Sequence, residues 1–204
     1  MGLISNGTTA FDAGSMSLGG QITFIKKLTA SGDSTLSFVH GSSSVVFDGT
    51  YKEYLITLKH IHPATNNVAL EMNFTQDGSS FAQSKTTTIF DAYSQEAGGD
   101  QGLRFENGDS NKCLANNTGW APLNYNMGNE NDGNLSGFVR IFDPAGTTFH
   151  KQFQVELSFQ YFNTYGIRQN TAGYVNASVA TVGVGFRFSS GNIDAGDICL
   201  YGVG

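Results

Sequence analysis

The chain has 204 residues, few charged side chains (14%) and a net charge of −6. Its length fits a single β-sandwich or barrel, because all-β folds of roughly 200–250 residues commonly form one core. Its 11 lysines and arginines are dispersed, so we expect no basic stripe of the kind that binds nucleic acid. No apolar run reaches the roughly 18 residues of a membrane span, so we expect no membrane insertion.

The first segment of the chain, residues 1–20, is rich in Gly, Ser and Ala and shows no hydrophobic periodicity. This composition predicts an extended N-terminal arm outside the core. Such an arm either docks on a neighbouring subunit or stays loose, and both alternatives are open. Met1–Asn6 lacks the basic and long apolar regions of a signal peptide, so we expect no secretion.

From Ile22 onward, apolar residues recur at every second position, which is the pattern of half-buried strands. The longest such run, 153–161, has nine residues and spans about 30 Å, enough to cross a sandwich. Phe159 is predicted to lie on its buried face. Further strands are predicted over Ile22–Leu28, Ser34–Val39, Tyr51–Ile61, Val68–Thr75, Thr86–Tyr93, Gly137–Phe142, Ala172–Asn176, Val182–Phe188 and Ile198–Val203.

About ten strands are therefore expected between residues 21 and 204, with no amphipathic helix between them. Asp-Gly and Asn-Gly steps separate the strands and supply their turns. This order of elements excludes a parallel α/β fold. It predicts an all-β, antiparallel β-sandwich formed by residues 21–204 as one domain, with a jelly roll as the first choice of topology.

A polar insert at residues 96–133 interrupts the strand pattern. It is rich in Gly, Asn and Asp, and it holds the only tryptophan of the chain, Trp120. A segment of this length without regular structure is usually functional. Surface loops also tolerate sequence change, because they make few buried contacts. We therefore expect residues 96–133 to form the partner-facing part of the molecule.

Aromatic side chains are the candidate contact residues. Trp120 together with Tyr125 can present flat apolar faces to a partner or to the sugar rings of a glycan. Tyr161, Phe162 and Tyr165 form a second aromatic group with the same potential. The alternative interpretation is that these rings pack in the core or between subunits. Trp120 and Tyr125 are the two residues that we single out.

Metal, cofactor and catalytic motifs are weak in this sequence. His60 and His62 share one face of a strand at a spacing that a metal can use, but a strand end is the simpler interpretation. The Asn- and Asp-rich loop 126–134 is rich enough in oxygen ligands for calcium. Arg140, however, occupies the position at which an EF-hand has Glu. We predict no catalytic, cofactor-binding or metal-binding residue.

The cysteines and the carboxylates also form no recognisable motif. Cys113 and Cys199 fit neither a disulfide framework nor a metal site, so we expect two reduced thiols, with a disulfide as the alternative. The carboxylates are dispersed along the chain. A glycosidase pair can still assemble in space from distant residues, but we expect no enzyme activity.

Distinctive motifs occur at both ends of the chain. They are Met1–Thr9 with Phe11–Gly14, Thr50–Ile56 continuing to Ile61–Pro63, and Phe186–Ile193 followed by Gly196 and Leu200–Val203. These motifs resemble a group of small virion-type proteins encoded by tailed bacteriophages, especially aquatic ones. The resemblance covers both ends and most of the first third of the chain. It implies a phage virion subunit made in a bacterial cytoplasm, with no catalytic residue to carry over.

Three functions are compatible with these observations. The first is a tail-fibre or tail-tip component that binds a glycan or protein of the host surface, as a homotrimer and together with other virion proteins. The second is a capsid decoration (cement) protein, whose arm clamps neighbouring shell subunits. The third is a carbohydrate-active enzyme. We predict the first function, with the protein located in the virion after assembly in the host bacterial cytoplasm.

Overall fold

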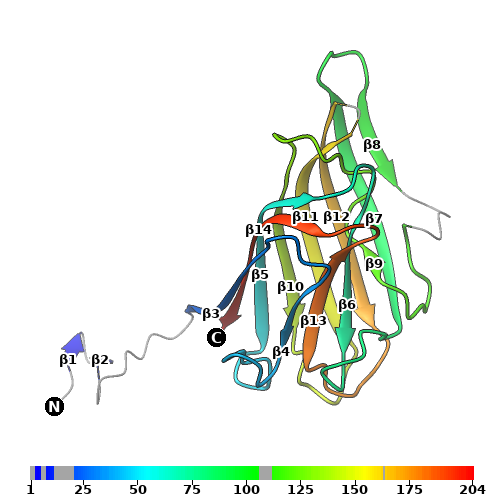
Figure 1. The fold of residues 1–204 in the computed structure, drawn as a ribbon. Coiled ribbons are helices and arrows are strands. Elements are labelled where there is room, and N and C mark those ends of the chain that lie inside the picture. The colour runs from blue at the N-terminus through cyan, green and yellow to red at the C-terminus, as the bar shows by residue number, and fades with distance from the viewer. Residues whose placement is uncertain (1–2, 6–7, 12–20, 106–111, 163) are drawn as a thin grey trace.

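The computed structural model describes residues 3–5, 8–11, 21–105, 112–162 and 164–204. Over these residues the chain is all-β, with no helix and with two main antiparallel sheets of eight and four strands (Figure 1). Among them we find no helix of the length and apolar character needed to cross a membrane. The all-β, antiparallel fold class predicted from the sequence is therefore confirmed.

The large sheet contains eight strands. Their order across the sheet is β3 (Ile22–Thr29), β14 (Ile193–Val203), β5 (Glu53–Pro63), β10 (Leu135–Phe142), β11 (Lys151–Tyr161), β12 (Tyr165–Val175), β7 (Lys85–Gln95) and β8 (Gln101–Phe105). Two hairpins, β7–β8 and β11–β12, make up the half of this sheet that ends at β8.

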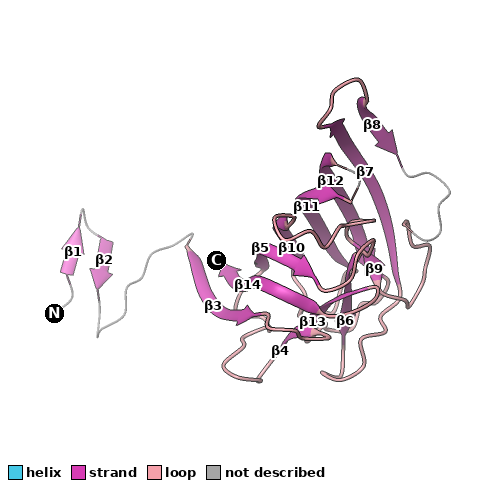
Figure 2. Ribbon diagram, turned by 45° about the horizontal axis from the view of Figure 1, so that its top comes forward, coloured by secondary structure: helices cyan, strands magenta, loops and turns pink. Residues whose placement is uncertain are grey.

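The small sheet contains four strands. Their order is β4 (Leu36–Val39), β13 (Gly183–Phe188), β6 (Leu70–Thr75) and β9 (Ala121–Pro122). In both views of the molecule β8 lies at the end away from β4 and β13 (Figures 1 and 2). The small sheet therefore faces only part of the large one.

One continuous hydrophobic core joins the two sheets in a β-sandwich-like arrangement. Phe74 of β6 and Phe153 of β11 meet in it, with ring centroids 5.4 Å apart. Along β11, Phe153, Val155, Leu157 and Phe159 are buried, whereas the intervening Gln152, Gln154 and Ser158 are exposed. The predicted two-residue alternation and the core position of Phe159 are confirmed.

The insert 96–133 differs from the surface loop that the sequence suggested. It contains β8 and β9, and Leu123, Tyr125 and Met127 within it are buried. These three residues alternate with more polar ones, which is a two-residue pattern that the high content of Gly, Asn and Asp obscures. The structure also begins β12 at Tyr165, well before the predicted start at Ala172. Residues 106–111 lie outside the described residues.

The N-terminal segment contains a short hairpin. Its strands are β1 (Leu3–Ser5) and β2 (Thr8–Phe11), and within the described chain each of them pairs only with the other. Residues 12–20 of the predicted arm lie outside the described residues. A two-stranded hairpin without further partners is marginally stable in water, so this hairpin gains little stability from its own pairing.

Replacing Phe159 by Ala tests the register of β11. Because the ring is 4% exposed and packs against Tyr125, Phe159→Ala should lower the free energy of unfolding by about 3–5 kcal/mol. Urea denaturation measures this change. The control is Ser158→Ala, one residue away on the exposed face, which should change stability by less than about 0.5 kcal/mol. Equal effects of the two substitutions would contradict the register.

Candidate functional site

A cleft lined by tyrosines lies where β7, β11 and β12 meet at one end of the large sheet. Its volume is about 240 Å³. Its walls are Tyr93, Asp100, Arg104, Tyr161, Tyr165 and Ile167. We call it the tyrosine cleft, and it contains two of the aromatic residues, Tyr161 and Tyr165, that the sequence indicated as stacking platforms.

Strand register brings the three tyrosines of the cleft together. Tyr165, at the start of β12, pairs with Tyr161 at the end of β11. Ile167, two residues further on, pairs with Tyr93 of β7. Because residues two apart on a strand share a face, all three rings lie on the same side of the sheet. The ring centroids of Tyr161 and Tyr93 lie 6.0 Å and 6.1 Å from that of Tyr165.

Two turns form the rim of the cleft and are bonded to each other. The backbone N–H of Glu96 donates to the carbonyl oxygen of Thr164 at 3.0 Å. The Tyr165 hydroxyl donates to Oδ2 of Asp100 at 3.0 Å. This hydrogen bond to Asp100 is the main reason why the pKa of Tyr165 is raised. The phenol therefore stays protonated at neutral pH and holds the Asp100 carboxylate at the rim.

Arg104 is anchored in the cleft wall by a buried carboxylate. Its Nε donates to Oδ1 of Asp91 at 3.1 Å, and Asp91 is fully buried. Its guanidinium carbon lies 4.4 Å from the ring centroid of Tyr93, a cation–π distance. Since a buried charge without a partner is strongly destabilising, Asp91 fixes the position of Arg104. The ion pair also leaves little net charge at this wall.

Tyr125 lies beneath the tyrosine cleft. Its ring is 5% exposed. Its hydroxyl donates to Oδ2 of Asp91 at 2.6 Å and accepts a hydrogen bond from Arg104. The ring centroids of Phe159 and Tyr161 each lie 6.0 Å from that of Tyr125. In this position Tyr125 holds the polar and aromatic parts of the cleft together, and its own face is covered.

Trp120 lies elsewhere, on the outer face of the small sheet. It stacks on Phe81 with ring centroids 5.8 Å apart, and the guanidinium carbon of Arg187 lies 4.5 Å from its centroid. A Cβ atom at Gly185 would come within 2.9 Å of Phe81 and 3.1 Å of Trp120. Glycine at this position therefore allows both rings to reach the strand. Trp120 and Tyr125 therefore do not form a common contact surface.

A buried lysine fastens the Trp120 segment to the sheets. Lys85, at the start of β7, is fully buried, and burial lowers its pKa to about 8. Its Nζ donates to Oδ1 of Asn73 (2.7 Å) and to the carbonyl oxygens of Gln83 (2.8 Å) and Gly119 (2.6 Å). Asn73 in turn donates to the carbonyl oxygens of Phe81 and Thr118. These bonds fix the backbone that carries Trp120.

Lys85, Asp91 and Arg104 are functional or structural residues that sequence reasoning missed. A signal for two of them was present, because Lys85, Thr87, Ile89 and Asp91 alternate with Thr86, Thr88 and Phe90. The predicted strand Thr86–Tyr93 already placed Asp91 on the face of Thr87 and Ile89, and extending it by one residue would have placed Lys85 on that face too. No comparable pattern marks Arg104, whose strand lies in the polar insert.

The structure brings the two metal candidates of the sequence into one hollow. His60 and His62 line it together with residues 131–134 and Asp194, and its volume is about 380 Å³. The His62 Nδ1 atom lies 3.4 Å from Asp194 Oδ2, and its Nε2 atom lies 3.1 Å from the carbonyl oxygen of Glu130. Among the described residues, no group of three or more His, Cys, Asp and Glu side chains is arranged to hold a metal ion.

The two cysteines lie in different parts of the fold. Cys199 is on β14, and Cys113 is in the segment that follows residues 106–111. Within the part of the chain that the structure describes, no disulfide joins them.

Comparison of the chain with protein-family models, with curated proteins and with solved structures finds no match.

Replacing Lys85 by Met tests how the insert is held. The substitution removes the Nζ donor from the carbonyl oxygens of Gln83 and Gly119, and it leaves buried Asn73 Oδ1 with only the N–H of Phe74. Lys85→Met should lower the free energy of unfolding by about 1–3 kcal/mol. It should also speed amide hydrogen exchange over residues 117–120, measured by mass spectrometry. The matched control is Lys59→Met at an exposed position of β5, which should leave that exchange unchanged. Unchanged exchange in both variants would show that Lys85 does not hold residues 117–120 in place.

Proposed function

We propose that this chain is a non-enzymatic structural protein of a tailed-bacteriophage particle, namely a tail-fibre or tail-tip component that binds the host surface. The observation that carries this proposal is the tyrosine cleft at the end of the large sheet. We further propose that the protein resides in the virion after assembly in the host bacterial cytoplasm, as a homotrimer in contact with other virion proteins. It resembles such proteins in the motifs at both ends of its sequence.

The strand order supports a jelly roll enlarged at one edge. Eight of the strands lie in the orders β3-β14-β5-β10 and β4-β13-β6-β9. Numbered one to eight along the chain, with β1, β2, β7, β8, β11 and β12 left out, these strands are first–eighth–third–sixth and second–seventh–fourth–fifth, as in a jelly roll. Jelly rolls are common in viral capsid proteins and in lectins. Fold alone does not fix function, so the case for host binding depends on the cleft.

The chemistry of the tyrosine cleft suits a host-surface glycan or protein. Aromatic faces offer large apolar contact area at a small cost in conformational entropy. Tyr93 and Tyr165 supply such faces, while Asp100 and Arg104 place an acceptor and a donor beside them. A pocket with apolar walls and a few fixed polar groups is the usual form of a ligand site.

A capsid decoration protein is the second candidate function. The β1–β2 hairpin favours it, because a hairpin that pairs only with itself among the described residues gains stability by docking on a neighbouring subunit. The same docking would serve trimer assembly in a tail fibre. Copy number separates the two roles, since decoration proteins are far more numerous in a particle than tail fibres.

The cleft is tested by replacing one of its rings. Tyr165→Ala removes a stacking face and the hydrogen bond to Asp100. Binding of the purified, labelled protein to host cells should weaken about tenfold or more, which corresponds to about 1.4 kcal/mol. The matched control is Phe149→Ala, an exposed ring (77%) in the connection before β11, at the end of that strand opposite Tyr161. Full host binding by folded Tyr165→Ala protein would show that the cleft is not the host-binding site, and it would favour the capsid decoration role.

The role of the N-terminal arm is tested by removing it. A chain that begins at Gln21 keeps both main sheets, so its thermal unfolding should resemble that of the whole protein. It should form a species of lower mass in solution and be absent from particles, because the contact with neighbouring subunits is lost. Light scattering and the protein content of purified particles measure these outcomes. Unfolding of the shortened chain would show instead that the arm belongs to the core.

A further inference from the structure

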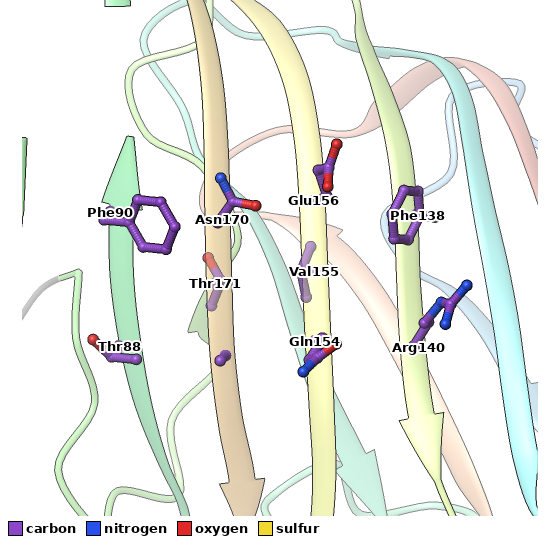
Figure 3. Close-up of a pocket in the computed structure, with 10 residues that line it drawn as sticks. Thr88, Phe90, Phe138, Arg140, Gln154, Val155, Glu156, Asn170 and Thr171 are labelled. Carbon is purple, nitrogen blue, oxygen red and sulfur yellow. The ribbon is translucent and has the colours of Figure 1, made fainter. Parts of the chain in front are cut away.

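The outer face of the large sheet carries a further hollow, across strands β10, β11, β12 and β7 (Figure 3). Its volume is about 390 Å³. Its floor is the sheet itself, because Val155 and Thr171, which border it, have side chains buried on the other face. We call this hollow the sheet-face groove. It lies on the side of the sheet opposite to the hydrophobic core and shares no lining residue with the tyrosine cleft.

Register arranges the lining residues in two rows across the strands. In the first row, each residue pairs with the next across neighbouring strands: Phe138 with Glu156, Glu156 with Asn170, and Asn170 with Phe90. Figure 3 shows the two phenylalanine rings on opposite sides of the groove, with the polar side chains between them. The row is therefore aromatic at both ends and polar in the middle.

The second row explains why the surface is hollowed. It runs from Arg140 to Gln154, then to Ala172 and Thr88. Ala172 and Thr88 are small, so they leave space beside the larger side chains of the first row. The three steps between neighbouring strands, about 4.8 Å each, separate β10 from β7 by about 14 Å. A ligand that touches both phenylalanine rings must therefore be extended.

The polar groups of the groove favour a neutral ligand. Arg168 Nη2 donates to Oε1 of Glu156 at 2.7 Å, and Arg140 lies 3.4 Å from Glu53. The charges near the groove are thus paired with one another. By contrast, the side-chain amides of Gln154 and Asn170 make no hydrogen bond to any of the residues that the structure describes.

An amide side chain both donates and accepts hydrogen bonds, as does a hydroxyl group. Gln154 and Asn170 therefore match the hydroxyl groups of a sugar, whose C–H faces pack on aromatic rings such as Phe90 and Phe138. An extended peptide is a poorer fit, because it usually adds to a free sheet edge through its backbone. Here β11 and β12 are paired on both sides, so only side chains are available.

We propose that the sheet-face groove binds a neutral oligosaccharide that lies across β10, β11, β12 and β7. One sugar ring packs on Phe138 and another on Phe90, of which 50% is exposed. Between them, sugar hydroxyls exchange hydrogen bonds with Gln154 and Asn170. This proposal depends on neither the tyrosine cleft nor a phage origin.

The test uses the whole protein and a panel of neutral hexasaccharides: those of cellulose, starch, laminarin, mannan, xylan and chitin. Binding is followed by NMR through the side-chain amide signals of Gln154 and Asn170. At least one hexasaccharide should shift both signals, with a dissociation constant insensitive to salt because no charge is neutralised. Phe90→Ala and Phe138→Ala should each weaken binding about tenfold, whereas Phe149→Ala, which removes an exposed ring from the connection before β11, should not.

Three results would overturn the proposal. They are no shift of the two amide signals with any hexasaccharide, binding that survives loss of both phenylalanine rings, and shifts that follow protein concentration alone. The last result would identify a second copy of the chain as the occupant. Tyr165→Ala separates failure of this proposal from failure of the proposed function. The substitution should weaken host binding and leave hexasaccharide binding in the groove unchanged.

Discussion

The register of β12 between β11 and β7 is the constraint on which both candidate sites depend. Eleven residues of β12 pair with β11, and the same eleven pair with β7. Because neighbouring residues on a strand face opposite ways, a slip of one residue would exchange the two faces of the strand. Tyr165 and Ile167 would leave the cleft, and Asn170 would leave the groove. One set of backbone bonds thus positions two sites on opposite faces of a sheet.

Beyond the small sheet, the inner face of β7 and β12 is covered by irregular chain. Such chain has backbone groups that no neighbouring strand satisfies, and burying them unpaired is costly. The sheet supplies the missing partners from its own buried face. Lys85 donates to the carbonyl oxygen of Gly119, Gln169 donates to that of Leu123, and Thr87 Oγ1 accepts from the N–H of Leu114. This accounts for polar residues where an apolar core would be expected.

The sequence allowed the strands to be predicted but not their neighbours. Alternation is a local property, so the strand around Phe159 and its buried face could be identified from the chain alone. Tyr93 and Arg104, which share the β7–β8 hairpin, become neighbours of Tyr165 only through the order of strands in the sheet, and no local pattern encodes that order. Trp120 was singled out because a large ring in a polar segment is conspicuous. Its contacts with Phe81 and Arg187 are again non-local.

The two hairpins that form the cleft also have a consequence for the time course of folding. Each hairpin, β7–β8 or β11–β12, closes a short loop, but β7 and β12 are brought together from distant parts of the chain. Contacts between distant segments form more slowly than local ones, because a long loop must close first. The tyrosine cleft lies across the pairing of β7 with β12, with Tyr93 on one hairpin and Tyr161 and Tyr165 on the other. We therefore expect a partly folded chain to have the hairpins before it has the cleft, so a ligand that binds in the cleft would distinguish finished molecules from folding intermediates.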